Sequence, residues 1–96
     1  MKTNKIQAIR TQEMRVVAAI YKYKNLSRAA EELGLTSNYV NVTLLRLEEK
    51  LGCTLFSRRQ RAGTIALTKH GMILAPKLKE MADIYLWILE NKENIK

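Results

Sequence analysis

The fold is decided by residues 26–52, which read LSRAAEELGLTSNYVNVTLLRLEEKLG. Residues 27–33 have the composition of a short capped helix that stops at Gly34. Thr36 and Ser37 then offer an N-cap for a second helix that runs to Leu51 and Gly52. Two helices joined by so short a turn are typical of a helix-turn-helix, in which the second helix protrudes to enter a groove of DNA. The pattern therefore predicts a DNA-binding protein.

A basic wing is predicted directly after this second helix. Residues 54–57 and 64–67 alternate in the manner of two short strands, with residues 58–63 as the loop between them. Arg58, Arg59 and Arg61 lie in that loop, and residues 53–71 contain no Asp or Glu. Such a loop suits a polyanionic partner.

Two longer helices are predicted on either side of this core. Apolar residues at helical spacing indicate a first helix over about residues 11–24, capped by Thr11 or starting earlier. Thr68 can cap a last helix that reaches about residue 91, with Pro76 early in it. The fold class expected is therefore mainly α: a winged helix-turn-helix domain over residues 1–71, with a two-stranded β wing, followed by a long C-terminal dimerisation helix within residues 72–96.

The helical spacing also predicts which way the second helix of the motif faces. Val40, Leu44, Leu47 and Leu51 fall within a narrow arc and are expected to face the core. The opposite face then carries Asn38, Val42, Leu45 and Glu49, with Ser37 and Asn41 on the flanks. Four glutamates are assigned to solvated helix faces: Glu31, Glu32, Glu48 and Glu49.

Composition and charge agree with a nucleic-acid partner. The chain has 96 residues, a formal net charge of +8 and a pI near 9.9, which suits one domain that binds a polyanion. The positive charge is concentrated in residues 1–25 and 53–71, whereas residues 26–52 are slightly acidic and residues 72–96 are neutral. A protein that is merely soluble would not need this distribution.

Catalytic, metal and membrane functions have little support in the sequence. Cys53 is the single cysteine and His70 the single histidine, so no metal-ligand spacing exists. We interpret Cys53 as a small buried thiol and His70 as a surface residue. We expect no enzymatic activity and no cofactor. The absence of a long apolar run or a signal core predicts a cytoplasmic protein without membrane contact.

Several motifs resemble the amino-terminal domain of the LysR-type transcriptional regulators. They are LSRAA at residues 26–30, LEEKLG at residues 47–52, LFSR at residues 55–58 and LTKHG at residues 67–71, in the family's order and spacing over about residues 14–81. The resemblance implies a winged helix-turn-helix, binding to double-stranded DNA and a homodimer. The chain departs from the family pattern in a slightly longer wing loop, in Asn38 where proline is common, and in Val42 where a long polar or basic residue is common. It also stops where the effector-binding domain would begin, so we expect a stand-alone chain without a small-molecule effector.

The candidate DNA contacts follow from side-chain chemistry. Hydroxyl and amide groups can bond phosphates or base edges, asparagine can pair with adenine, and valine can touch a thymine methyl group. Arginines at the start of the first motif helix and in the wing would hold phosphates. The predicted DNA-binding residues are Arg28, Ser37, Asn38, Tyr39, Asn41, Val42, Thr43, Arg58, Arg59 and Arg61. The alternative for each is structural: Ser37 only caps its helix, Asn38 faces water, Tyr39 packs on a neighbouring helix, and the arginines form a solvated loop.

The last helix is predicted to be the dimer contact, because its apolar stripe is longer than a small domain can cover. The residues assigned to this contact are Leu78, Met81, Ile84, Tyr85, Ile88 and Leu89. Two alternatives remain open. In the first, the chain is an interaction module that heterodimerises with another transcription factor, namely a full-length regulator. In the second, it is a nucleoid-type DNA binder of low specificity.

Overall fold

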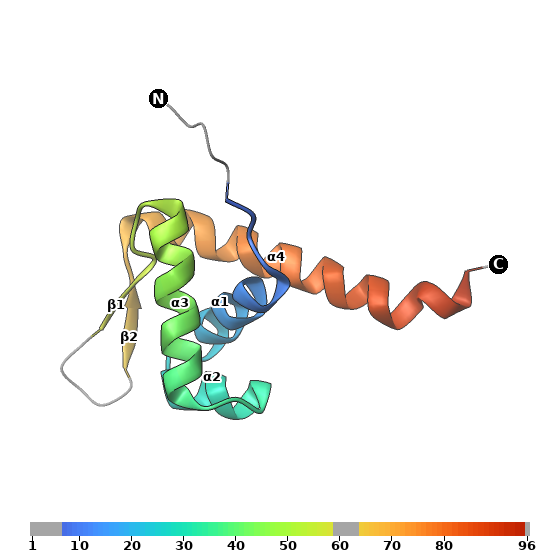
Figure 1. Cartoon of the computed structure of the whole chain (residues 1–96), viewed down its shortest axis with the longest axis horizontal. Helices are drawn as coiled ribbons and strands as arrows, with labels where there is room; N and C mark the ends of the chain where they lie inside the picture. The colour runs from blue at the N-terminus through green and yellow to red at the C-terminus, as the bar shows by residue number, and fades with distance from the viewer. Residues whose placement is uncertain (1–6, 59–63, 96) are drawn as a thin grey trace.

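The computed structural model describes residues 7–58 and 64–95 (Figure 1). Within these residues the elements are α1 (Thr11–Tyr23), α2 (Leu26–Leu33), α3 (Ser37–Leu51), β1 (Phe56–Arg58), β2 (Ile65–Leu67), α4 (Lys69–Asn91) and the 3-10 helix η1 (Lys92–Asn94). The helix-turn-helix is formed by α2 and α3, and β1 and β2 form the wing. The winged-helix class predicted from the sequence is confirmed.

The helix N-termini follow the predicted caps in two of four cases. Thr36 Oγ1 accepts the backbone N–H of Tyr39 at 3.0 Å, and Thr68 Oγ1 accepts that of Gly71 at 3.0 Å. The cap of α2 is Asn25, whose side chain accepts the backbone N–H of Arg28 at 2.9 Å, so the helix begins before Ser27. Asparagine is as good a cap as serine, and the earlier start also packs Leu26 on the core.

The start of α1 also differs from the expected cap. Thr11 is the first residue of the helix, and Arg10 holds the cap position. The backbone N–H of Arg10 donates to the carboxylate of Glu13 at 2.8 Å. The acceptor for the backbone N–H of Arg10 is therefore a side chain from the first turn of the helix. This is the bond that the glutamate makes in a capping box.

The core lies where α1, α3 and α4 meet the wing. The inward face of α3 is as predicted, with Val40, Leu44 and Leu47 fully buried and Leu51 half-buried. β1 and β2 contribute Phe56 and Ile65, which are 1% and 4% exposed. Burial of these two apolar side chains in the common core holds the wing on the helices.

The wing is a two-stranded antiparallel sheet that is shorter than predicted. Its register pairs Phe56 with Leu67 and Arg58 with Ile65. The residues before β1 bond elsewhere: the carbonyl of Thr54 accepts the hydroxyl of Thr68 at 2.6 Å, and the carbonyl of Leu55 accepts its backbone N–H at 3.0 Å. The approach to β1 is therefore tied to the start of α4 and not to β2.

α4 packs on the domain from its start to about Ala82. Ala75, Leu78 and Ala82 are buried against the core, whereas the second half extends away from it (Figure 1). Several large apolar side chains are consequently exposed along the extension. Among the helices of the described residues, none is long and apolar enough to cross a membrane.

Candidate nucleic-acid interface

The amino-terminal half of α3 presents polar side chains to solvent. Ser37 and Asn38 are exposed, Tyr39 is 45% exposed and Asn41 is half-buried. Val42 is 39% exposed on the same face, next to these groups along the helix. The structure thus brings together five of the side chains that the sequence predicted on the DNA-facing side. Tyr39 is not packed under a neighbouring helix.

Thr43 lies on the other side of α3. It is only 5% exposed and belongs to the buried face of the helix, beside Leu44 and Leu47. The sequence did not reveal this, because threonine is polar and the core arc was drawn from the aliphatic residues alone. We therefore leave Thr43 out of the proposed contact surface.

The carboxyl-terminal half of α3 is anchored by a buried glutamate. Glu48 is 6% exposed, and its Oε2 accepts the backbone N–H groups of Leu55 at 2.7 Å and Phe56 at 3.3 Å. The expectation that Glu48 lies on a solvated helix face is wrong, because the chain folds back over it to begin β1. Glu49, one position along, is exposed as predicted. Glu48 therefore connects the recognition helix to the wing through the backbone.

A second anchor joins the end of α3 to the start of α1. Lys50 Nζ contacts both carboxylate oxygens of Glu13, at 3.0 and 2.7 Å, and donates to the carbonyl of Ala8 at 3.0 Å. The side chains of Lys50 and Glu13 are 12% and 2% exposed. Burial alone would raise the pKa of Glu13, but the backbone N–H of Arg10 and the ammonium group of Lys50 hold it below its ordinary value.

The wing arginines are only partly within the described residues. Arg58 is the last residue of β1, where its backbone pairs with Ile65. Arg59 and Arg61 lie outside the described residues, and their assignment as phosphate contacts stays a prediction. So does that of the Arg58 side chain.

Beside the wing, the turn from α1 to α2 carries cations held on aromatic rings. The guanidinium group of Arg28 lies 5.2 Å from the ring centre of Tyr23, whose hydroxyl donates to Glu32 at 2.8 Å. Lys24 Nζ lies 4.7 Å from the ring centre of Tyr21. Arg28 is among the DNA contacts predicted from the sequence, whereas Lys24 is not. The alternation of tyrosine and lysine in YKYK at residues 21–24 was the signal available.

The second half of α4 carries the exposed apolar surface. Met81, Ile84, Ile88 and Leu89 are 44%, 59%, 51% and 42% exposed, and Tyr85 is half-buried. Leu86 and Trp87 are also exposed. A hollow of about 280 Å³ lies on this surface, lined by Met14 of α1 together with Met81, Ile84, Tyr85 and Ile88.

Leu78 does not belong to that exposed surface. It is 5% exposed and packs into the chain's own core with Ala75 and Ala82. The sequence could not reveal this, because the apolar stripe of α4 is continuous. Its early residues are buried in the core and its late residues are exposed, and the pattern does not show where the change occurs. Leu78 is thus removed from the residues that would meet a second chain.

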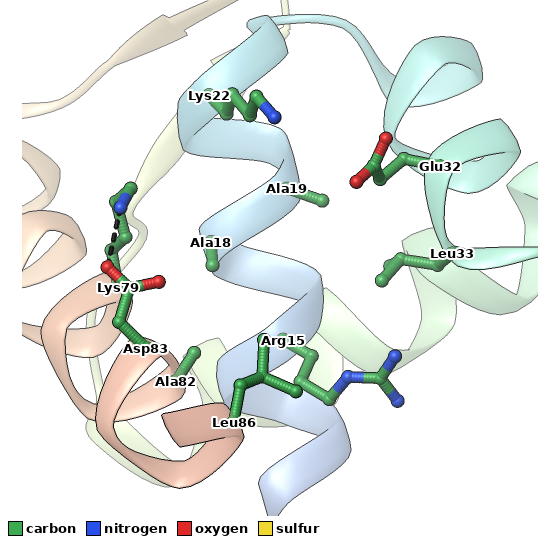
Figure 2. Close-up of a pocket in the computed structure, with 10 residues that line it drawn as sticks. All are labelled: Arg15, Ala18, Ala19, Lys22, Glu32, Leu33, Lys79, Ala82, Asp83 and Leu86. Carbon is green, nitrogen blue, oxygen red and sulfur yellow. Dashed lines mark hydrogen bonds and ion pairs between the residues drawn. The ribbon is translucent and has the colours of Figure 1, made fainter. Parts of the chain in front are cut away.

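A separate pocket of about 400 Å³ lies between α1, α2 and α4 (Figure 2). Its floor includes Ala18, Ala19 and Ala82, whose small side chains leave the space open. Its acidic groups already have partners: Asp83 pairs with Lys79 at 2.7 Å, and Glu32 accepts the hydroxyl of Tyr23. None of the predicted DNA-contact residues lines this pocket.

No group of three or more His, Cys, Asp or Glu side chains that could hold a metal ion occurs among the described residues. His70 is exposed, as predicted. Cys53 is half-buried against the core, in agreement with a small packing thiol.

The chain belongs to the LysR family of bacterial regulatory helix-turn-helix proteins, whose family model matches residues 11–72. It is 37% identical over 71 residues to the HTH-type transcriptional regulator CrgA of Neisseria meningitidis. That match covers 74% of this chain and 21% of the relative. The chain therefore spans about a fifth of the length of the curated relatives it matches.

Solved structures share the fold. A mutant of OxyR from Corynebacterium glutamicum superposes with a TM-score of 0.87 at 24% identity, over 97% of this chain and 29% of that one. The DNA-binding domain of CbnR, solved as a DNA complex, superposes with a TM-score of 0.76 at 19% identity, over 90% of this chain and 97% of that one. The second match covers nearly the whole of that solved domain, so the two chains share the same fold.

Proposed function

We propose that the chain binds double-stranded DNA sequence-specifically and regulates transcription as a homodimer. The observation that carries the proposal is the amino-terminal half of α3, where Ser37, Asn38 and Tyr39 are exposed on a helix whose opposite face is buried. A protruding helix with this polarity fits the major groove, where base edges offer donors and acceptors. The proposal is supported by relatives that are named as transcriptional regulators and by a structural neighbour solved with DNA.

Base reading would come from α3. The amides of Asn38 and Asn41 match the donor and acceptor pattern of adenine, and Val42 offers methyl groups to thymine. Ser37 and Tyr39 supply hydroxyls for base edges or phosphates. We expect this surface to determine sequence preference, because its side chains vary in chemistry along the groove.

Backbone affinity would come from cations around α3. Arg28 is exposed near the start of α2. Arg58 ends β1, and Arg59 and Arg61 follow it in the sequence. Contacts of arginine with phosphate release counterions and therefore make affinity depend on salt. They carry no sequence information of their own.

A salt titration on two duplexes tests the DNA proposal. One duplex is selected for tight binding from a random library, and the other has a scrambled sequence. Wing arginines alone, about six per dimer, should give a slope of log affinity against log salt on the order of −5. Replacing Arg58, Arg59 and Arg61 with alanine should weaken binding to both duplexes and flatten the slope. Equal affinity for both duplexes would instead indicate a nucleoid-type binder, and binding to neither would refute the proposal.

The homodimer is proposed from the exposed surface of α4. Met81, Ile84 and Ile88 stand beside the hollow that Met14 helps to line, so a second copy of α4 would bury a continuous apolar area. A twofold, antiparallel pair of these helices closes the assembly with two chains. It would also present two copies of α3 to one DNA duplex, which favours a palindromic site.

Charged substitutions on α4 test the dimer. Met81→Glu with Ile88→Glu should yield a folded monomer with greatly reduced DNA affinity, as measured by sedimentation and binding. Lys92→Glu, on the exposed 3-10 helix, is the matched control and should remain dimeric. A native monomer at micromolar concentration, bound to DNA one chain per site, would overturn the homodimer. Monomers that pair only with another regulator would favour the heterodimer.

A further inference from the structure

Lys24 adopts an unusual backbone conformation at the end of α1. Its φ is 53°, and it is the one non-glycine residue with positive φ among the described residues. The corresponding caps of α2 and α3 are Gly34 and Gly52, which adopt this region without a Cβ clash. Lysine is a poor choice for the same conformation, since its Cβ is crowded there. A residue kept at a strained position invites a functional explanation.

The side chain of Lys24 is exposed yet held in place. Its Nζ donates to the carbonyl of Tyr21 at 2.7 Å and lies 4.7 Å from the ring centre of the same residue. These two contacts use part of the ammonium group, which has three donors. The side chain is exposed, and the ring limits the rotamers that it would otherwise sample.

The position of Lys24 is beside the wing. Its carbonyl accepts the backbone N–H of Ile65, the first residue of β2, at 3.2 Å. The next residue, Asn25, forms a β-bridge with Thr64 and caps α2, which leads to Arg28. In Figure 1 the turn between α1 and α2 lies near the start of α3 and beside the wing strands. Lys24 is thus fixed by backbone bonds to the same strand that borders the arginine-rich loop.

We propose that Lys24 is a DNA phosphate contact, close in the chain to Arg28. This inference rests on the proposed DNA binding, and it adds a contact outside both the recognition helix and the wing. Lys24 precedes Asn25 in the turn between α1 and α2, and Arg28 follows it near the start of α2. Both cations lie over tyrosine rings. A cation already oriented by a ring loses less side-chain freedom when it meets a phosphate. Lys24 therefore contributes to affinity on every sequence and to preference on none.

Lys24→Gly separates a DNA contact from a purely structural role. A DNA contact predicts weaker binding with unchanged stability, whereas a structural role predicts lower stability with unchanged binding. Glycine relieves the strain at positive φ, so the melting temperature should stay the same or rise. Loss of the charge should weaken binding roughly three- to tenfold on both a selected and a scrambled duplex, and flatten the salt slope by about 0.9 for each bound chain. Lys24→Arg keeps the cation and should retain most of the affinity. Lys92→Gln removes the same charge from the far end of the chain and should leave the slope unchanged.

Two results would overturn the inference. If Lys24→Gly binds both duplexes with wild-type affinity and slope, Lys24 does not contact DNA, and the proposed function stands without it. If the substitution lowers the melting temperature while affinity of the folded protein is unchanged, the ammonium group serves only to cap the carbonyls at the end of α1. Failure of the wild-type chain to bind any duplex would refute both proposals, so the two failures are distinguishable.

Discussion

The two ends of α3 differ in how firmly they are held. At the amino end, the cap is one hydroxyl of Thr36, and Ser37, Asn38 and Tyr39 are exposed. At the carboxyl end, two buried carboxylates hold the helix, with Glu48 bonded to the backbone before the wing and Glu13 paired with Lys50. The anchored end sets the direction of the helix, which leaves the exposed end free to vary in chemistry without loss of the fold.

This contrast predicts that substitutions at the two ends have separable effects. A change at the anchored end should lower the free energy of unfolding and affect binding only through the pose of the helix. A change at the exposed end should affect binding and leave stability nearly constant.

Lys50→Met should have the largest effect. It leaves the buried Glu13 carboxylate without its cation, and breaking a pair of this kind costs about 3 kcal/mol of unfolding free energy. Urea denaturation measures the loss. The double variant Glu13→Gln with Lys50→Met removes both charges and should recover much of the stability. Equal destabilisation by the single and double variants would show that the charge pairing is not the reason.

Glu48→Ala should be next. It leaves the backbone N–H groups of Leu55 and Phe56 without an acceptor inside the protein, at a cost of about 2 kcal/mol. Glu48→Gln keeps one acceptor oxygen and should lose less. Glu49→Ala is the matched control, because the Glu49 side chain is exposed. The unfolding free energy of this variant should differ from wild type by less than about 0.5 kcal/mol. If Glu48→Ala has the same unfolding free energy as the control, the hydrogen bonds to Glu48 do not contribute to stability.

Asn38→Ala addresses the exposed end. Loss of an amide that pairs with a base should weaken binding to a selected duplex by about 1–2 kcal/mol and to scrambled DNA by much less. The exposed side chain should contribute little to unfolding free energy. Asn41→Ala should behave similarly in binding. Equal weakening on both duplexes would mean that α3 contacts only the backbone.

The smallest effect is expected in the pH dependence of stability. Because the folded pKa of Glu13 is lowered from 4.5, its contribution is present above that pH and is lost as pH falls through the folded pKa. Glu13→Gln should therefore flatten the fall in unfolding free energy below about pH 4.5, relative to the wild type. An unchanged pH profile would contradict the ion pair as a source of acid sensitivity.

The sequence predicted features that depend on local pattern. The facing of α3 followed from the spacing of Val40, Leu44 and Leu47, and the caps at Thr36 and Thr68 followed from residue type. These succeed because helical periodicity and capping involve neighbours in the chain.

Features that depend on contacts between residues far apart in the sequence could not be predicted. Glu48 is buried only because the chain folds over it before β1, and Leu78 is buried because α4 packs on α1. Thr43 is buried for the same kind of reason. The exposed face of α3 followed from its periodicity. The position of Lys24 beside β2 could not be predicted, because it depends on the Asn25–Thr64 bridge.

In the proposed dimer, Gly71 would influence the spacing of the operator without touching DNA. A Cβ at this position would overlap the carbonyl oxygen of Leu55, so α4 can begin this close to β1 only with glycine. A bulkier residue would tilt α4 relative to the recognition helix. In the proposed dimer, that tilt would change the distance between the two copies of α3, and with it the number of base pairs between half-sites. The preferred spacing of a palindrome would then depend on a residue that reads no base.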